Sequence, residues 1–178
     1  MASWSEFAAD VPRLADGVRR LLQQYGPGLG YLATVRADGG PRVHPVSPVL
    51  AEEGLFCFVI DSPKRRDLER DGRYALHSFP AEESDDEAYL AGRAQLVTDP
   101  ARVTRLARRH CAIYDIDWRL FEFSIDVAMI AQHDIAGVAR PAVQVWLEPG
   151  GQAGSGEPGQ PRRAGSPAPT VDQGNAAA

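Results

Sequence analysis

The chain has 178 residues, a length that suits one domain or one domain followed by a tail. Hydrophobic residues make up 44% and charged residues 24%, values typical of globular proteins. The formal net charge of −5 argues against a nucleic-acid-binding domain, which would carry a basic surplus. No stretch approaches the roughly 18 consecutive apolar residues of a transmembrane helix, so no membrane partner is expected.

The N-terminus and the cysteines indicate a cytoplasmic protein. Residues 1–6 lack the basic segment and apolar run of a secretory signal. Cys57 and Cys111 are the only cysteines, and two widely spaced thiols in such a chain are expected to stay reduced. The cysteines form no pair and no histidine pair has metal-ligand spacing, so no metal site is expected.

The C-terminal segment differs in composition from the rest of the chain. Residues 149–178 are rich in Gly, Pro and Ala, contain no aromatic residue, and have Val171 as their only large aliphatic one. Such a segment cannot bury enough apolar surface to offset the entropy of ordering it. We therefore predict a folded domain over residues 1–148 and a disordered tail over 149–178.

Two helices are predicted at the start of the domain. Ser3 and Glu6 have the spacing of a capping box at the start of the first helix. Asp10 is a candidate cap for a second helix that has Pro12 in its first turn and ends at Gly26-Pro27-Gly28. The apolar stripe of the second helix indicates a packing role.

Strand patterns follow. Residues 31–36 are β-prone, and Ala37-Asp38-Gly39-Gly40 is a hairpin signal. Residues 41–50 would form the second strand, but three prolines require it to be bulged or to lie at an edge. The continuous apolar run over 55–60 is typical of a central, buried strand.

The remaining elements alternate between helix and strand. A helix over 62–71 has Ser62 or Asp61 as its cap, and a later helix opens at Asp99-Pro100 with His110 on its packing side. The further strands are predicted at 74–79, 89–97, 120–131 and 142–147. Six or seven mostly antiparallel strands with flanking helices predict a mainly β fold, a closed or split barrel.

The segment that begins with Asp61 carries the main chemical signal. Free backbone N–H groups at the helix start, the Ser62 hydroxyl and the cations of Lys64 and Arg65 can converge on an anion such as phosphate. Arg42 could add a bidentate contact from the side. Lys64 is the single lysine among 19 basic residues, which hints at a particular geometric need. The alternative is a helix whose charges are merely solvated.

Several motifs together resemble a known family. They are residues 30–39 (GYLATVRADG), residues 41–46 (PRVHPV), and Ser62-Pro63-Lys64 followed by Asp67-Leu68 and Arg70-Asp71. These motifs resemble the FMN-binding split β-barrels of the pyridoxamine 5′-phosphate oxidase superfamily. The resemblance covers about residues 3–147 and includes the leading helices, the strand order and a penultimate-strand tryptophan, Trp146.

The resemblance implies a homodimer with two flavin sites at the subunit interface. It implies that Arg42 and Lys64 bind the flavin phosphate, assisted by Ser62 and Arg65. Along the isoalloxazine ring it would place His44, Pro45, Val46 and Ser47. Backbone groups of Ile60 and Asp61 would approach the polar edge of the ring. No side chain is assigned a catalytic role, because the chemistry would belong to the cofactor.

Two questions stay open from the sequence. Residues 140–147 lack the Arg and His pair with which the vitamin oxidases grip their substrate, so another small-molecule substrate is expected. The cofactor is FMN or the deazaflavin coenzyme F-420, which small actinobacterial relatives use. The function is either an oxidoreductase that transfers hydride between this cofactor and an unidentified substrate, or a non-catalytic flavin-binding or storage protein. Haem handling, known in some relatives, finds no anchoring motif here.

Overall fold

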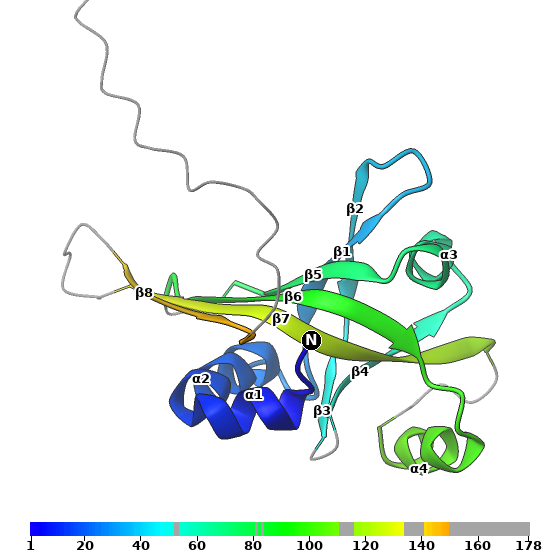
Figure 1. The fold of residues 1–178 in the computed structure, drawn as a ribbon, viewed down its shortest axis with the longest axis horizontal. Helices are drawn as coiled ribbons and strands as arrows, with labels where there is room; N and C mark the ends of the chain where they lie inside the picture. Colours follow the sequence, from blue (N-terminus) through cyan, green and yellow to red (C-terminus); the bar gives the residue numbers. More distant parts are fainter. Residues whose placement is uncertain (52–53, 81, 83, 111–115, 134–140, 150–178) are drawn as a thin grey trace, which may run out of the picture.

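One antiparallel sheet, curled on itself and flanked by helices, makes up the fold (Figure 1). The computed structural model describes residues 1–51, 54–80, 82, 84–110, 116–133 and 141–149. The predicted tail lies outside these residues, apart from Pro149. No helix in the described ranges is long and apolar enough to cross a bilayer.

The first two helices form as predicted, with one difference at a cap. In α1 (Trp4–Asp10), Ser3 Oγ accepts from the Glu6 N–H and Glu6 accepts from the Ser3 N–H, so the capping box is confirmed. The residue that caps α2 (Pro12–Gln23) is Val11, not Asp10. The Asp10 carboxylate instead accepts a 2.6 Å hydrogen bond from Trp146 Nε1, 136 residues later in the chain.

The strand predicted over residues 41–50 is in fact two strands. β1 (Gly30–Val35) and β2 (Pro41–Val46) form the predicted hairpin, with Gly39 at φ 83° in its turn. β3 (Val49–Ala51) pairs with β4 (Gly54–Ile60). The order β2-β1-β5-β6-β7-β4-β3 puts β2 at one edge and β3 at the other, where proline is tolerated.

The division of that segment gives eight strands in the described residues, against the six or seven expected. The remaining elements, in chain order, are α3 (Pro63–Arg70), β5 (Arg73–Ser78), β6 (Glu87–Leu96), α4 (Pro100–His110), β7 (Trp118–Gln132) and β8 (Ala142–Leu147). The long β7 pairs with β6 along one side. On its other side its first half pairs with β4 and its second half with β8.

The register of the β6–β7 pairing shifts between Ala91 and Gly92, which pair with Val127 and Ile125, so Asp126 is the extra residue of a bulge in β7. A Cβ at Gly92 would collide with the Ser124 carbonyl oxygen, so the bulge requires glycine. The curvature lets the sheet wrap around its own core. The predicted mainly β, antiparallel split barrel with flanking helices is confirmed.

The main core lies on one face of the sheet. Figure 1 shows α1 and α2 against the same side of β6, β7 and β8. Trp4 and Phe7 are buried there, and the Phe7 ring lies 5.0 Å from that of Trp146. A second, smaller cluster joins α4 to the sheet through Leu106, Phe56 and Leu120. This second cluster lies on the other face of the sheet, because Phe56 and Leu120 alternate with the core residues Cys57 and Phe121 along β4 and β7. In the described part of the chain, the rest of that face, from β2 across to β8, has no covering helix.

Candidate functional site

A cavity lies where the two edges of the sheet approach each other. Only Ser47 and Pro48 separate the end of β2 from the start of β3, and the three chain steps from Val46 to Val49 span at most about 11 Å. The edges are therefore held close although they are at opposite ends of the strand order. The cavity has a volume of about 380 Å³, and we call it the seam cavity. Its lining residues are Pro27, Pro45, Val46, Ser47, Val49, Cys57, Phe58, Ile60, Lys64 and His110.

Half of the predicted cofactor-binding residues meet in this cavity. Pro45, Val46 and Ser47 come from the end of β2, Ile60 from the end of β4, and Lys64 from the first turn of α3. Most of the wall is apolar, and the Lys64 ammonium contributes a positive charge. A flat apolar group that carries an anion at one end fits such a lining.

The first turn of α3 is shaped by Ser62 and Pro63. Ser62 occupies the N-cap position and Pro63 the first helical position, as expected from the sequence. The Ser62 hydroxyl does not cap the helix but donates to the Ile60 carbonyl at 2.9 Å. The backbone N–H groups of Arg65 and Arg66 both donate to the Ser62 carbonyl. This turn positions Lys64 at the cavity wall.

Arg42 lies beside the seam cavity and not in its wall. Its Nε donates at 2.7 Å to Oδ2 of Asp67, a carboxylate only 3% exposed. Asp67 also accepts from Thr34 Oγ1 at 3.0 Å and from Arg70 at 3.2 Å. Burial would raise the pKa of Asp67, but these three donors outweigh it and hold the pKa below its ordinary value. Asp67 is therefore an ionised anchor for Arg42.

His44 lies on the same side of β2 as Arg42. Its Nε2 is buried and has no hydrogen-bond partner in the described structure. Burial lowers the pKa of His44, and the nearby cations Lys64 and Arg42 lower it further, against the opposite effect of Asp67. The imidazole is thus neutral at pH 7 and surrounded by positive charge. An anion bound here would balance the two cations and approach the unpartnered His44.

Arg65 does not line the seam cavity. Its guanidinium is buried and donates to Asp117 Oδ2 at 2.9 Å, with Asp61 at 3.3 Å and Glu69 at 3.8 Å. The exposed carboxylate of Asp61 contacts Arg65 and Arg66 and likewise lies outside the cavity lining. These ion pairs hold the start of α3 to the segment before β7.

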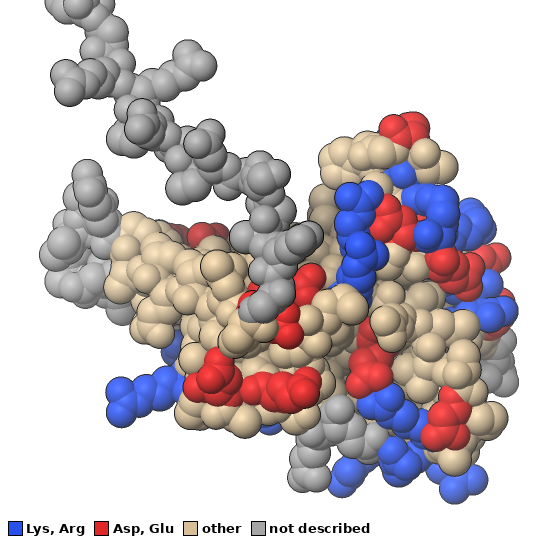
Figure 2. Space-filling view, viewed as in Figure 1, with Lys and Arg blue, Asp and Glu red and all other residues tan. Residues whose placement is uncertain are grey.

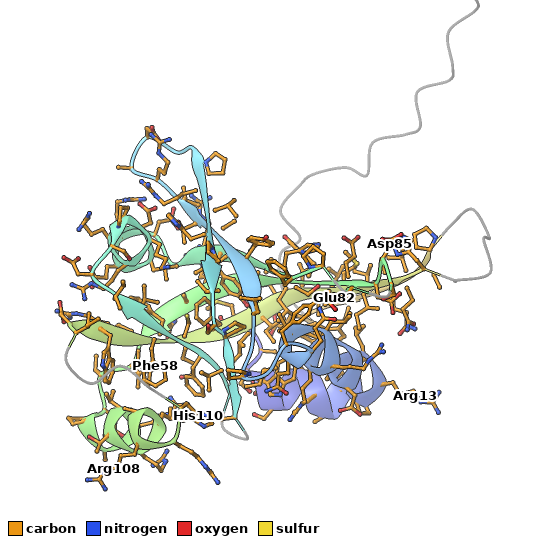
Figure 3. The ribbon with its side chains drawn as sticks, turned by 180° about the vertical axis from the view of Figure 1, so that it is seen from behind. Arg13, Phe58, Glu82, Asp85, Arg108 and His110 are labelled. Carbon is orange, nitrogen blue, oxygen red and sulfur yellow. The ribbon has the colours of Figure 1, made fainter. Side chains whose placement is uncertain are left out.

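The cavity also contains residues that the sequence did not single out. Burial raises the pKa of the Cys57 thiol to about 12, so it stays protonated and acts as an apolar wall. The packing role predicted for His110 is wrong, because His110 is exposed and lines the cavity. Figure 3 shows Phe58 and His110 on the side of α4 that faces the sheet, with Arg108 on the far side. As the last residue of α4, His110 lies beyond the packed part of the helix.

The part of the sheet face that no described helix covers borders the seam cavity at Pro45. We call this the open face. From β2 across to β8 its register positions are Val43, Pro45, Ala33, Tyr31, Ala75, His77, Ala91, Tyr89, Val127, Met129, Leu147 and Val145. Val43, Val145 and Leu147 are among its exposed apolar residues. Figure 2 shows a largely uncharged surface over β8, whereas Lys and Arg gather over the end that carries α3 and α4.

The fold and these motifs define the class of protein. An antiparallel split β-barrel is formed by these residues, and the sequence profile of pyridoxamine 5′-phosphate oxidase matches residues 14–133. That match spans more than half of the chain. The chain belongs to the pyridoxamine 5′-phosphate oxidase family. No curated protein matches it.

Solved structures share the fold at low sequence identity. A haem-binding protein from Mycobacterium smegmatis is 19% identical with a TM-score of 0.52, and the match covers 72% of this chain but only 57% of that protein. A protein related to general stress protein 26 from Clostridium acetobutylicum is 14% identical with a TM-score of 0.55, covering 81% and 96% of the two chains. General stress protein 26 from Bacillus anthracis is 18% identical with a TM-score of 0.50, covering 65% and 91%.

Proposed function

We propose that this protein is a flavin-dependent oxidoreductase that binds FMN, or the deazaflavin coenzyme F-420, in the seam cavity. One observation carries the proposal: an apolar cavity lies next to the positive charges of Lys64 and Arg42, which both act on the neutral His44. A phosphorylated ring cofactor has the complementary pattern, an apolar plane with an anionic end. Family membership supports the same class of ligand.

The chain's residues would divide the work of binding. Pro45, Val46 and Ile60 would pack against the ring and exclude water from it. Lys64 would bind the phosphate, and the outer guanidinium nitrogens of Arg42, which the Asp67 contact leaves free, would assist. A phosphate at this corner would also provide the partner that His44 Nε2 lacks.

The bound cofactor would supply hydride transfer to or from a small-molecule substrate. The described residues of the cavity support chemistry centred on the cofactor. The Cys57 thiol is protonated at neutral pH, which removes it as a nucleophile. His110 and Lys64 are the other ionisable groups in the lining, and Lys64 is assigned to the phosphate. The protein would thus bind the cofactor, orient it and enclose it.

A second copy of the chain is the proposed occupant of the open face. Small side chains at Ala33, Ala75 and Ala91 form its centre, and a wide apolar face of this kind is a typical homodimer contact. Pro45 belongs to both the open face and the cavity lining. A partner seated on this face would therefore border the cofactor.

The second candidate is a flavin-binding or storage protein that does not turn over. It is favoured by the structural neighbour from Mycobacterium smegmatis, which is described as a haem-binding protein. The cavity lining contains few groups that could act as an acid or a base, which also suits a binding role. An oxidoreductase would reduce and reoxidise its loaded cofactor repeatedly, whereas a storage protein would only hold and release it.

The first test is the absorption spectrum of the purified full-length protein, followed by mass spectrometry of the ligand released on denaturation. The expected result is FMN or the deazaflavin, bound stoichiometrically. Repeated turnover with a reduced nicotinamide or reduced deazaflavin and an electron acceptor would establish the oxidoreductase. Tight binding without turnover would establish the storage role. If the protein binds neither cofactor, both the oxidoreductase and the storage role are excluded.

A further inference from the structure

A second hollow lies on the other side of the first turn of α3. It is a groove of about 480 Å³, and we call it the arginine groove. Its lining residues are Arg36, Ala37, Asp38, Arg42, Pro63, Arg66, Asp67 and Arg70. Pro63 lines this groove and the next residue, Lys64, lines the seam cavity. The two hollows are therefore neighbours, separated by one turn of helix.

The arginine groove is positively charged in an acidic protein. It is lined by four arginines and two aspartates, an excess of two positive charges, in a chain whose net charge is −5. Each guanidinium has five N–H donors in a fixed fork, and the carboxylate contacts use only part of them. The Arg66 side chain is 62% exposed and has one contact at 3.3 Å to Asp61. Arg36 is paired with Asp38 at 2.6 Å and is 47% exposed.

Two of the four arginines are held in place from behind. Arg42 and Arg70 both donate to the buried Asp67, and Arg70 also donates to the Val35 carbonyl. These contacts already restrict the two side chains, so little further conformational entropy is lost when their remaining N–H groups bind a ligand. Such preorganisation favours the binding of an anion. Arg36 and Arg66 form the exposed rim, where a ligand can reach them directly.

Positive charge continues from the seam cavity into the groove. Arg42 lines the groove, while its charge and that of Lys64 both act on His44. A cofactor phosphate between Lys64 and Arg42 would leave any longer tail to pass over the first turn of α3. A tail attached to that phosphate would therefore extend toward the four arginines of the groove.

We infer that the arginine groove binds a second anionic group, a phosphate or carboxylate carried on the cofactor beyond its first phosphate. The inference rests on the proposed function and narrows it, because a cofactor with an extended anionic tail then fits better than a mononucleotide. Arg66 and Arg36 would contact a cofactor with such a tail but would not contact a mononucleotide. Planar guanidinium forks recognise both phosphate and carboxylate, so the two chemistries need separate probes.

The experiment titrates full-length apo-protein with riboflavin, FMN and FAD, which carry no, one and two phosphate groups. In the Arg36→Ala/Arg66→Ala double variant we expect FAD affinity to fall about 10- to 100-fold, as for the loss of one or two charge-assisted hydrogen bonds, with FMN affinity within twofold of wild type. Arg13→Ala is the matched control. It removes an exposed arginine on α2, which Figure 3 places far from α3, and should change none of the three affinities.

Inorganic pyrophosphate and a tetraglutamate peptide, titrated alone by calorimetry, separate phosphate from carboxylate recognition. Weaker binding of either in the double variant, with FMN unchanged, supports the groove as an anion site. If FMN and FAD weaken equally, or if the double variant binds every probe as wild type does, the groove is a set of surface ion pairs and the inference fails. A third outcome separates the two proposals. If the wild-type protein binds no flavin but binds pyrophosphate or tetraglutamate, and the double variant binds that probe more weakly, the proposed function fails and the anion site stands.

Discussion

Arg42 on β2 donates from Nε to Oδ2 of Asp67 on α3 at 2.7 Å, and Thr34 on β1 donates to the same oxygen at 3.0 Å. One buried carboxylate thus joins two strands and a helix. The contact also determines which part of Arg42 can face a ligand, because Nε is engaged and the outer nitrogens are not. A residue predicted from the sequence to bind phosphate is therefore first a structural residue.

Replacing Asp67 with asparagine should destabilise the protein substantially. The change removes the negative charge that Arg42 and Arg70 share, and breaking a buried ion pair costs about 3–5 kcal/mol. The arginines are 31% and 40% exposed and partly solvated, so we expect a loss of about 2–3 kcal/mol. Urea denaturation measures it. Asp38→Asn removes an exposed partner of Arg36 and should cost under about 1 kcal/mol.

The same residue should shape the loss of stability in acid. The pKa of Asp67 in the folded state lies below its ordinary value of 3.8, so the unfolded chain takes up the proton first as the pH falls. The contribution of Asp67 is therefore complete well above pH 3.8 and is lost as the pH drops through the folded-state pKa. Asp67→Asn should show a shallower decline below about pH 4 than wild type. Parallel curves would mean that Asp67 titrates normally.

Lys64→Ala should weaken FMN binding. A charge-assisted bond to phosphate is worth about 1.5–3 kcal/mol, which corresponds to a roughly 10- to 150-fold higher Kd. Lys64→Arg should recover only part of this, because a planar fork does not replace a compact ammonium. Fluorescence quenching of FMN by apo-protein measures the affinities.

Arg66→Ala is the control for Lys64. Arg66 lies two positions along the same turn but lines the arginine groove and not the seam cavity, so FMN binding should be unchanged. The melting temperature of each apo-variant should stay close to that of wild type, since neither side chain is buried. Equal FMN affinity in wild type and Lys64→Ala would remove the phosphate assignment.

A charge at the centre of the open face should disrupt the proposed homodimer. Ala75 lies on β5 between Ala33 and Ala91, so Ala75→Glu places a carboxylate where the partner would pack. Light scattering at micromolar concentration should show a dimer for wild type and a monomer for the variant, with unchanged circular dichroism. Ala101→Glu, on the exposed side of α4, should remain dimeric. A wild-type monomer with cofactor bound would contradict the shared interface.

Removing residues 149–178 should have little effect. The described domain ends where Glu148 forms a 2.7 Å ion pair with the Met1 ammonium and donates its N–H to the Asp126 carbonyl. The composition of the segment beyond it predicts no packed core. Calorimetry of the chain truncated after Glu148 should give nearly the wild-type melting temperature, and FMN affinity should be retained. A large drop in either would show that the segment packs on the barrel.

The sequence by itself was sufficient for features set by neighbouring residues. The Ser3–Glu6 capping box, Pro12 at the start of α2 and the turn around Gly39 all form as predicted. Each depends on backbone groups within a few residues, so local pattern contains the whole cause. The motifs around Lys64 likewise pointed to the family to which the chain belongs.

The tertiary structure decided which distant groups meet. The prolines of residues 41–50 indicated an edge, but only the closure of the sheet shows that β2 and β3 occupy opposite edges and enclose a cavity between them. Arg65 has the same local spacing to the helix start as a phosphate ligand would, yet Asp117, 52 residues away, engages it. Asp10 likewise accepts a hydrogen bond from Trp146, a residue distant in the chain, and does not cap a helix. Ion pairs and buried hydrogen bonds depend on distance in space, which periodicity and spacing along the chain do not contain.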